Sequence, residues 1–113
     1  MELKNIKDVT ADPITMFGST KTTIQWIWGK KDKVPHFAMR KFIIEPGGHI
    51  GIHEHPEEHE ILVLSGTGLV SNESGQQFNI LPNDTLYVPP HEAHGYKNTG
   101  SINFEFLCII PLL

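Results

Sequence analysis

Hydrophobic and polar residues alternate along most of the chain in short runs, and each run ends in residues typical of turns. The clearest run covers residues 22–28 and places Ile24, Trp26 and Trp28 on one face. An alternation with a period of two predicts a β-strand, because successive side chains of a strand point to opposite faces. Runs with a helical period are almost absent, so the pattern predicts an all-β protein.

Further runs of the same kind continue to the end of the chain, and we expect about eight or nine short strands in all. Turn signals recur about every 8–12 residues, a spacing typical of a β-sandwich or a β-barrel. No internal repeat is visible. The other predicted strands are residues 36–45, which end at Pro46-Gly47-Gly48, and residues 60–65, 69–71, 76–81, 85–88, 94–97 and 102–110.

The pattern also predicts how the chain is organised. A length of 113 residues fits one domain with a core large enough to be stable without disulfides. Residues 1–20 are expected to form an irregular N-terminal arm with at most one short strand. Residues 21–113 are expected to form the β-barrel. An arm of this kind either packs on a partner subunit or frays.

Charge and cysteine content exclude several classes of function. The net charge is -4 and no basic run is present, so neither nucleic acid nor an anionic membrane is expected as a partner. Cys108 is the single cysteine, which excludes an internal disulfide and fits the cytoplasm. Cys108 lies in an apolar run and is expected to behave as a small buried hydrophobic residue. No signal peptide or membrane-spanning stretch is recognised.

Two histidine clusters about forty residues apart carry the candidate chemistry. His53 and His55 would point to the same side of a strand, as two ligands of one metal ion must. His59 follows after a turn and can face back toward them, and His94 arrives from a distant hairpin. Neutral imidazole is the commonest protein ligand of divalent transition metals. The four histidines therefore predict a metal site that forms only when the chain folds.

The two clusters resemble the two conserved motifs of the cupin superfamily. The first motif is matched by Gly47, His53, His55, His59 and Gly66, and the second by Asn83, Pro89, His91, His94 and Asn98. The resemblance implies a single-domain jelly-roll β-barrel, similar to small bacterial cupins of the oxalate-decarboxylase-like type.

The sequence departs from the family pattern at three positions. His59 stands where the family has a glutamate ligand, and a longer count would select Glu60 instead, so Glu60 is the alternative fourth ligand. Asn83 and His91 replace two family glycines. Asn83 is a mild change, because asparagine tolerates a left-handed backbone, whereas His91 would lie near the ligands or be exposed. His36 and His49 are interpreted as ordinary loop or surface histidines.

Four neutral imidazoles would leave a divalent ion with its full charge and therefore favour an anionic oxygen ligand. We expect one Mn, Fe, Ni, Co, Zn or Cu ion and a small polar or anionic substrate, with oxygenase, decarboxylase or isomerase chemistry. A binding or sensing module and a domain with a purely structural metal are the alternatives. A homodimer is expected, as in the family. The candidate substrate pocket consists of Arg40, if it faces inward, with Ile61, Val63, Phe104 and Phe106.

Overall fold

The longest strand determines the shape of the molecule. The computed structural model describes residues 1–113, and in it β3 runs without interruption from Phe37 to His53. The first part of β3 pairs with β9 and with most of β2, whereas its last part pairs with β8. The prediction that Pro46-Gly47-Gly48 ends this strand is therefore wrong. Gly47 takes a φ of 82°, so the chain bends here and continues.

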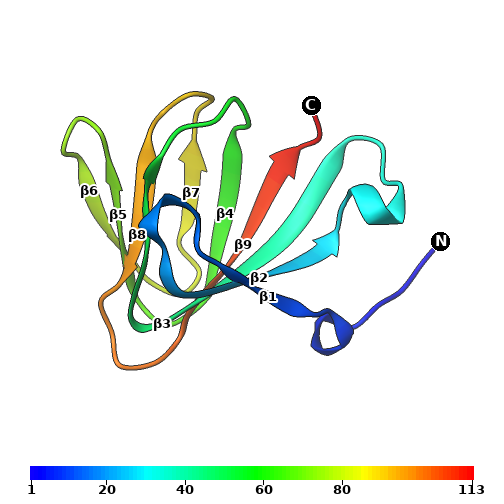
Figure 1. The fold of residues 1–113 in the computed structure, drawn as a ribbon, viewed down its shortest axis with the longest axis horizontal. Helices are drawn as coiled ribbons and strands as arrows, with labels where there is room; N and C mark the ends of the chain where they lie inside the picture. Colours follow the sequence, from blue (N-terminus) through cyan, green and yellow to red (C-terminus); the bar gives the residue numbers. More distant parts are fainter.

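All strands belong to one antiparallel sheet that curls into a half-barrel (Figure 1). Along the sheet the strands follow the order β6-β5-β8-β3-β9-β4-β7, and β2 pairs with both β3 and β1. The all-β jelly-roll prediction is confirmed. The strands are β1 (Ala11–Ile14), β2 (Thr20–Trp28), β3, β4 (His59–Ser65), β5 (Gly68–Asn72), β6 (Gln77–Ile80), β7 (Thr85–Val88), β8 (His94–Asn98) and β9 (Phe104–Pro111), with 3-10 turns at Ile6–Asp8, Met16–Gly18 and Lys30–Asp32.

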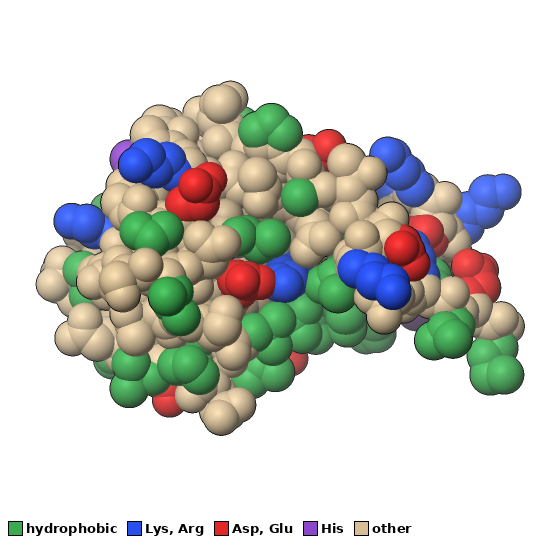
Figure 2. All heavy atoms as spheres, turned by 90° about the horizontal axis from the view of Figure 1, so that it is seen from below, with side chains coloured by type: hydrophobic (Ala, Val, Ile, Leu, Met, Phe, Trp, Pro, Cys, Tyr) green, Lys and Arg blue, Asp and Glu red, His purple; other side chains and the backbone are tan.

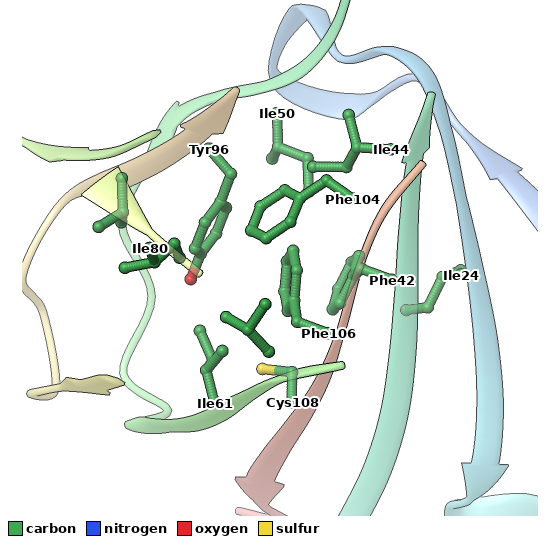
Figure 3. Packing of buried hydrophobic residues seen from close by; sticks show 12 residues of the cluster. Ile24, Phe42, Ile44, Ile50, Ile61, Ile80, Tyr96, Phe104, Phe106 and Cys108 are labelled. Atoms are coloured by element: carbon green, nitrogen blue, oxygen red, sulfur yellow. The ribbon is translucent and has the colours of Figure 1, made fainter. Parts of the chain in front are cut away.

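The hydrophobic core fills the hollow of this sheet. Every second side chain is buried along β4, along residues 38–44 of β3 and along residues 104–108 of β9, as the alternation of the sequence predicts. The aromatic rings of Phe42, Tyr96, Phe104 and Phe106 pack against one another in the centre (Figure 3). This packed layer supports the end of the half-barrel where the histidines lie.

On β2 the predicted faces are only partly right. Ile24 is buried, but Trp26 is 44% exposed and Ile27 is buried in its place. A register shift between Trp26 and Trp28 interrupts the pairing with β3 and changes which residues face inward. A one-residue irregularity of this kind leaves no clear sign in the hydrophobic pattern.

The N-terminal arm lies against the sheet of its own chain. Its strand β1 pairs with β2, and the ring of Phe17 stacks on His53 with 4.3 Å between ring centroids. The carbonyl oxygen of Phe17 lies so close to Gly51 that a Cβ atom added there would be 1.9 Å away. The arm is thus fitted to the strand that carries His53.

Charged side chains of both signs are spread over the surface. Figure 2 shows acidic and basic side chains intermixed on one face, so that face carries no patch of a single sign. None of the helical segments is long and apolar enough to cross a membrane.

Candidate metal centre

Four histidine side chains meet at one end of the half-barrel. His53 ends β3, His55 lies in the following loop, and His59 and His94 begin β4 and β8. The candidate ligand atoms of His53, His55 and His94 all lie within 4.8 Å of one another. His59 lies beside them, with its ring centroid 4.4 Å from that of His55 and 4.9 Å from that of His94. The two sequence clusters therefore converge in space.

Backbone carbonyls fix the ring orientation of two of these histidines. The Nδ1 atom of His53 lies 2.8 Å from the carbonyl oxygen of Gly51, and that of His94 lies 2.7 Å from the carbonyl oxygen of Glu92. Because a carbonyl only accepts, Nδ1 must carry the proton and donate in both rings. The lone pair is left on Nε2, the atom that a metal would bind.

The other two histidines have side-chain partners at the same ring position. The Nδ1 atom of His59 lies 3.3 Å from the Sγ atom of Cys108, and that of His55 lies 3.4 Å from a carboxylate oxygen of Glu57. The contact with Glu57 is not a hydrogen bond, because Nδ1 of His55 is buried without a hydrogen-bond partner. In the other three rings Nδ1 is hydrogen-bonded outside the cluster. This arrangement leaves their Nε2 atoms as candidate metal ligands.

Burial keeps three of the imidazoles neutral, those of His53, His59 and His94. It lowers the pKa of His59 from 6.5 to about 2 and the pKa of His94 from 6.5 to about 4. Burial also lowers the pKa of His53. Neutral imidazole is the form that binds metal. The Nε2 atom of His94 is buried without any hydrogen-bond partner, which is costly unless an ion or ligand supplies one. The residues present therefore fit a divalent ion.

The structure separates His59 from the alternative ligand Glu60. His59 is 4% exposed and shares the inward face of β4 with Ile61 and Val63. Glu60 is exposed on the outer face, in register with Tyr87 of β7. A carboxylate on the outer face of the strand cannot reach the cluster without a change of register.

The predicted pocket residues lie beneath the cluster as a packed wall. Ile61, Val63, Phe104 and Phe106 are all buried in the central core. Arg40 also faces inward and is 9% exposed, and its Nη2 atom donates a hydrogen bond to the Sγ atom of Cys108 over 3.0 Å. No carboxylate forms an ion pair with Arg40. Its positive charge therefore remains uncompensated close to the imidazoles.

A cavity of about 280 Å³ opens beside His94, and apart from His94 its lining residues are not among the predicted ligand and pocket residues. Its polar side is formed by Asn72 and Glu92, which are joined by a hydrogen bond of 3.3 Å. Its apolar side comes from β5, β6 and β7 through Val70, Phe78, Leu86 and Val88. β7 belongs to the second histidine motif, whereas β5 and β6 lie outside both motifs and reach His94 only through the folded sheet.

The remaining histidines lie outside the cluster. His36 and His91 are exposed, and the Nδ1 atom of His91 lies 3.4 Å from the carboxylate of Glu54. His91 takes a φ of 66°, which explains why the family has glycine at this position. His49 is half-buried, and its Nδ1 atom is hydrogen-bonded to the hydroxyl of Thr20 over 3.0 Å.

Comparison with known proteins identifies relatives that share this architecture. The family model described as "Cupin domain" matches residues 40–110. An oxalate-binding protein of Thermotoga maritima is 36% identical over 83 residues, which are 73% of this chain and 66% of that protein. A mannose-1-phosphate guanylyltransferase of Klebsiella pneumoniae is 34% identical over 85 residues, which are 71% of this chain but only 18% of the enzyme. The chain thus spans less than two thirds of the length of these relatives.

Solved structures agree on the fold. The polyketide cyclase RemF of Streptomyces resistomycificus superposes with a TM-score of 0.91 and 27% identity, over 98% of this chain and 79% of that one. A predicted oxalate decarboxylase of Thermotoga maritima superposes with a TM-score of 0.87 and 24% identity, over 99% of this chain and 100% of that one. At this identity the second likeness speaks for the fold alone.

Proposed function

Because the chain belongs to the cupin family, we propose that it binds one divalent transition metal through His53, His55, His59 and His94 and acts there on a small polar or anionic molecule. The structure brings together the ring nitrogens of His53, His55 and His94. The role of His59 as fourth ligand, the identity of the metal and the reaction are proposed in addition.

The observation that carries the proposal is the convergence of the four rings, three of which share one orientation. The Nδ1 atoms of His53, His94 and His59 are hydrogen-bonded outside the cluster, to the carbonyl oxygens of Gly51 and Glu92 and to the sulfur of Cys108. Outer partners of this kind fix the ring and raise the basicity of the other nitrogen in known metal sites. A surface histidine tract without a metal has no need for buried or half-buried rings oriented in this way.

The surroundings favour an anionic oxygen as the group that is bound. A divalent ion held by four neutral imidazoles keeps its full charge and acts as a Lewis acid toward such an oxygen. Arg40 adds a second uncompensated positive charge from below. The hydroxyl of Tyr96 is buried without a hydrogen-bond partner and can donate to an oxygen of the ligand. A small carboxylate, enolate or related anion matches these three groups.

Catalysis and simple ligand binding are both consistent with such a site. The cavity beside His94 argues against a purely structural metal, because it gives a small molecule access to a ligand residue. Glu92 in its wall is a candidate acid or base for oxygenase, decarboxylase or isomerase chemistry. The name of the oxalate-binding relative favours the second candidate function, a module that binds a small dicarboxylate without converting it.

Elemental analysis of the purified protein tests the metal site directly. We expect about one transition-metal ion per chain in the wild type, a loss of this metal in His94→Ala, and much weaker binding in His59→Ala. Glu60→Ala is the matched control, since the next residue of the same strand points outward, and it should keep its metal. Metal-free wild-type protein that binds neither Zn²⁺ nor Co²⁺ would refute the proposal.

Titration of the metal-loaded protein with oxalate then separates the two functions. Calorimetric binding with no change of the oxalate over hours supports a binding module. Loss of oxalate, or conversion of related keto acids, supports an enzyme. Neither effect is expected in His94→Ala.

A further inference from the structure

A buried chain of polar contacts connects three strands beneath the fourth histidine. Arg40 on β3 donates from Nη2 to the Sγ atom of Cys108 on β9 over 3.0 Å. The same sulfur lies 3.3 Å from the Nδ1 atom of His59 on β4. Arg40 is 9% exposed, His59 4% and Cys108 0%. The three side chains therefore form a closed unit inside the core, where Figure 3 shows the Cys108 sulfur beside Ile61.

The arginine at the far end of this chain is held in place by aromatic rings. The guanidinium carbon of Arg40 lies 5.0 Å from the ring centroid of Phe42 and 5.4 Å from that of Trp26. Both distances are within the range of cation–π attraction. No carboxylate pairs with Arg40. Its hydrogen bond to the sulfur is the one hydrogen bond that its side chain makes. The sulfur is thereby kept in a fixed position relative to β4.

The sulfur lies next to Nδ1 of His59, where it can accept a hydrogen bond from an Nδ1–H group and so leave the lone pair of Nε2 free for a metal. An imidazole that binds through Nε2 must carry its proton on Nδ1. That N–H then needs an acceptor, and the Sγ atom of Cys108 is the partner within reach. If the ring turned over, a carbon atom would take the place of Nε2 at the cluster. A hydrogen bond to the sulfur opposes this rotation, just as backbone carbonyls do for His53 and His94.

We propose that Cys108, itself held by Arg40, is the positioning residue that orients His59 as the fourth metal ligand. This inference rests on the proposed metal site. It assigns a role to a cysteine whose place in an apolar run suggested nothing more than core packing. It also gives Arg40, which has no acidic partner, a use in the core, since its Nη2 N–H group donates to the same sulfur that lies next to the imidazole.

The test compares three variants with matched packing effects. Cys108→Ala removes the acceptor, and Cys108→Ser keeps an acceptor, a hydroxyl oxygen that is stronger than sulfur but lies farther from the imidazole because the Cβ–O bond is shorter than Cβ–S. Val63→Ala removes a buried side chain from the same core, where Val63 is 1% exposed, without touching any histidine. Outer partners of metal-bound histidines typically contribute a factor of about 10–100 to metal affinity. We expect Cys108→Ala to weaken Zn²⁺ binding by about this factor, Cys108→Ser to recover part of it, and Val63→Ala to leave it within about threefold.

Two measurements that do not depend on activity test the positioning role of Cys108. Zn²⁺ affinity is measured by competition with a chromophoric chelator, and the ring protons of the Zn²⁺-loaded protein are observed by NMR after ¹⁵N-histidine labelling. The wild type and Val63→Ala should show a slowly exchanging Nδ1 proton for His59. In Cys108→Ala this signal should broaden or disappear, while those of His53 and His94 remain. The Co²⁺-loaded form should show an altered d–d absorption spectrum in the same variant.

The outcomes distinguish a failure of the positioning role of Cys108 from a failure of the proposed metal site. If Cys108→Ala and Val63→Ala have the same affinity and the same His59 proton signal as the wild type, the positioning role is wrong while the metal site stands. If Cys108→Ala weakens binding no more than Val63→Ala does, the effect is one of packing and the inference is also refuted. If the wild type binds no Zn²⁺ at all, the proposed function itself fails.

Discussion

Acidification should destabilise the metal-free protein at a pH where few proteins of this size lose stability. His59 and His94 are buried, and their pKa values in the folded protein are about 2 and about 4, compared with 6.5 in an exposed histidine. The unfolded chain therefore takes up protons at a pH where the folded chain does not. Stability is fully present above the unfolded pKa of 6.5 and falls as the pH decreases toward the folded values.

The expected loss follows from these two shifts. Between pH 6.5 and about pH 5 each of the two histidines should lower the free energy of unfolding by about 1.5 kcal/mol, together about 3 kcal/mol. His53, whose pKa is lowered as well, adds to the loss. Ordinary carboxylates titrate near pH 4, so they contribute little in this interval. A domain of this size has a total stability of about 5–15 kcal/mol, and the loss is a large part of it.

Urea unfolding of the metal-free protein, followed by tryptophan fluorescence at a series of pH values, measures this loss. His94→Gln removes one of the two groups and should reduce the pH slope by about one proton. His36→Gln is the matched control, because His36 is exposed and its replacement should leave the slope unchanged. A free energy of unfolding that stays constant between pH 6.5 and 5, or an equal slope in His94→Gln and the wild type, would refute the reasoning.

Three further substitutions test the surroundings of the site. Asn98→Ala removes two hydrogen bonds to the carbonyls of Ile44 and Ile102 and one from the amide of Gly100. Urea unfolding should show a decrease of about 3 kcal/mol in the free energy of unfolding. A decrease below about 0.5 kcal/mol would contradict this. Tyr96→Phe removes a buried hydroxyl without a partner, so the free energy of unfolding of the metal-free protein should rise by about 1 kcal/mol. The metal-loaded variant should bind small anions more weakly in calorimetry. Unchanged anion binding would show that the hydroxyl does not contact the ligand. Gly51→Ala places a Cβ atom against the Phe17 carbonyl, so the arm should detach, with faster proteolysis within residues 1–20; a cleavage rate equal to that of the wild type would argue against this fit.

The fold was predictable because it follows from a local pattern. Alternation along residues 59–65 and 104–110 predicts buried side chains at every second position, and His59, Ile61 and Val63 on β4 are buried in that way. The pattern failed at two places on β2 and β3. The exposed Trp26 follows from a register shift, and the continuous strand through Pro46 follows from the bend at Gly47. Both depend on how neighbouring strands pair, which alternation within one strand does not encode.

The convergence of the histidines was predictable to a similar degree. Spacing predicted His53 and His55 on one side of a strand; in the structure β3 ends at His53 and His55 lies in the following loop, but the ring nitrogens of both still converge with that of His94. Alternation could not separate His59 from Glu60, because either choice gives an alternating strand, and only the spacing to Gly66 favoured His59. The order of strands determines which face of β4 is turned toward the hollow of the sheet, and His59 lies on that face. The homodimer and the cytoplasmic location remain predictions.

The partners of the imidazoles lay beyond prediction for a different reason. Glu57 is close in sequence to its histidine, but Cys108 lies 49 residues from His59 and Arg40 lies 68 residues from Cys108. Residues this far apart meet only through the pairing of β9 with both β3 and β4, which places Arg40 opposite Cys108 and Cys108 opposite Ile61. No local property marks a cysteine as a hydrogen-bond acceptor rather than a core residue.

Burial of the histidines links the stability of the protein to its metal. The same burial that lowers the pKa of His53, His59 and His94, and so keeps these rings able to bind an ion, leaves the Nε2 atom of His94 without a partner in the core. An unsatisfied buried nitrogen costs about 1–3 kcal/mol, which a bound ion would remove. In total, an ion at a free concentration of 100 times its dissociation constant raises the free energy of unfolding by about 2.7 kcal/mol, and the relief of this nitrogen is part of that binding energy. Replacement of His94 with an apolar residue distinguishes the two cases. If the protein binds no ion, the variant should be more stable than the wild type, because an unsatisfied buried nitrogen has been removed. If the protein binds a metal ion, the variant should lose both the metal and stability.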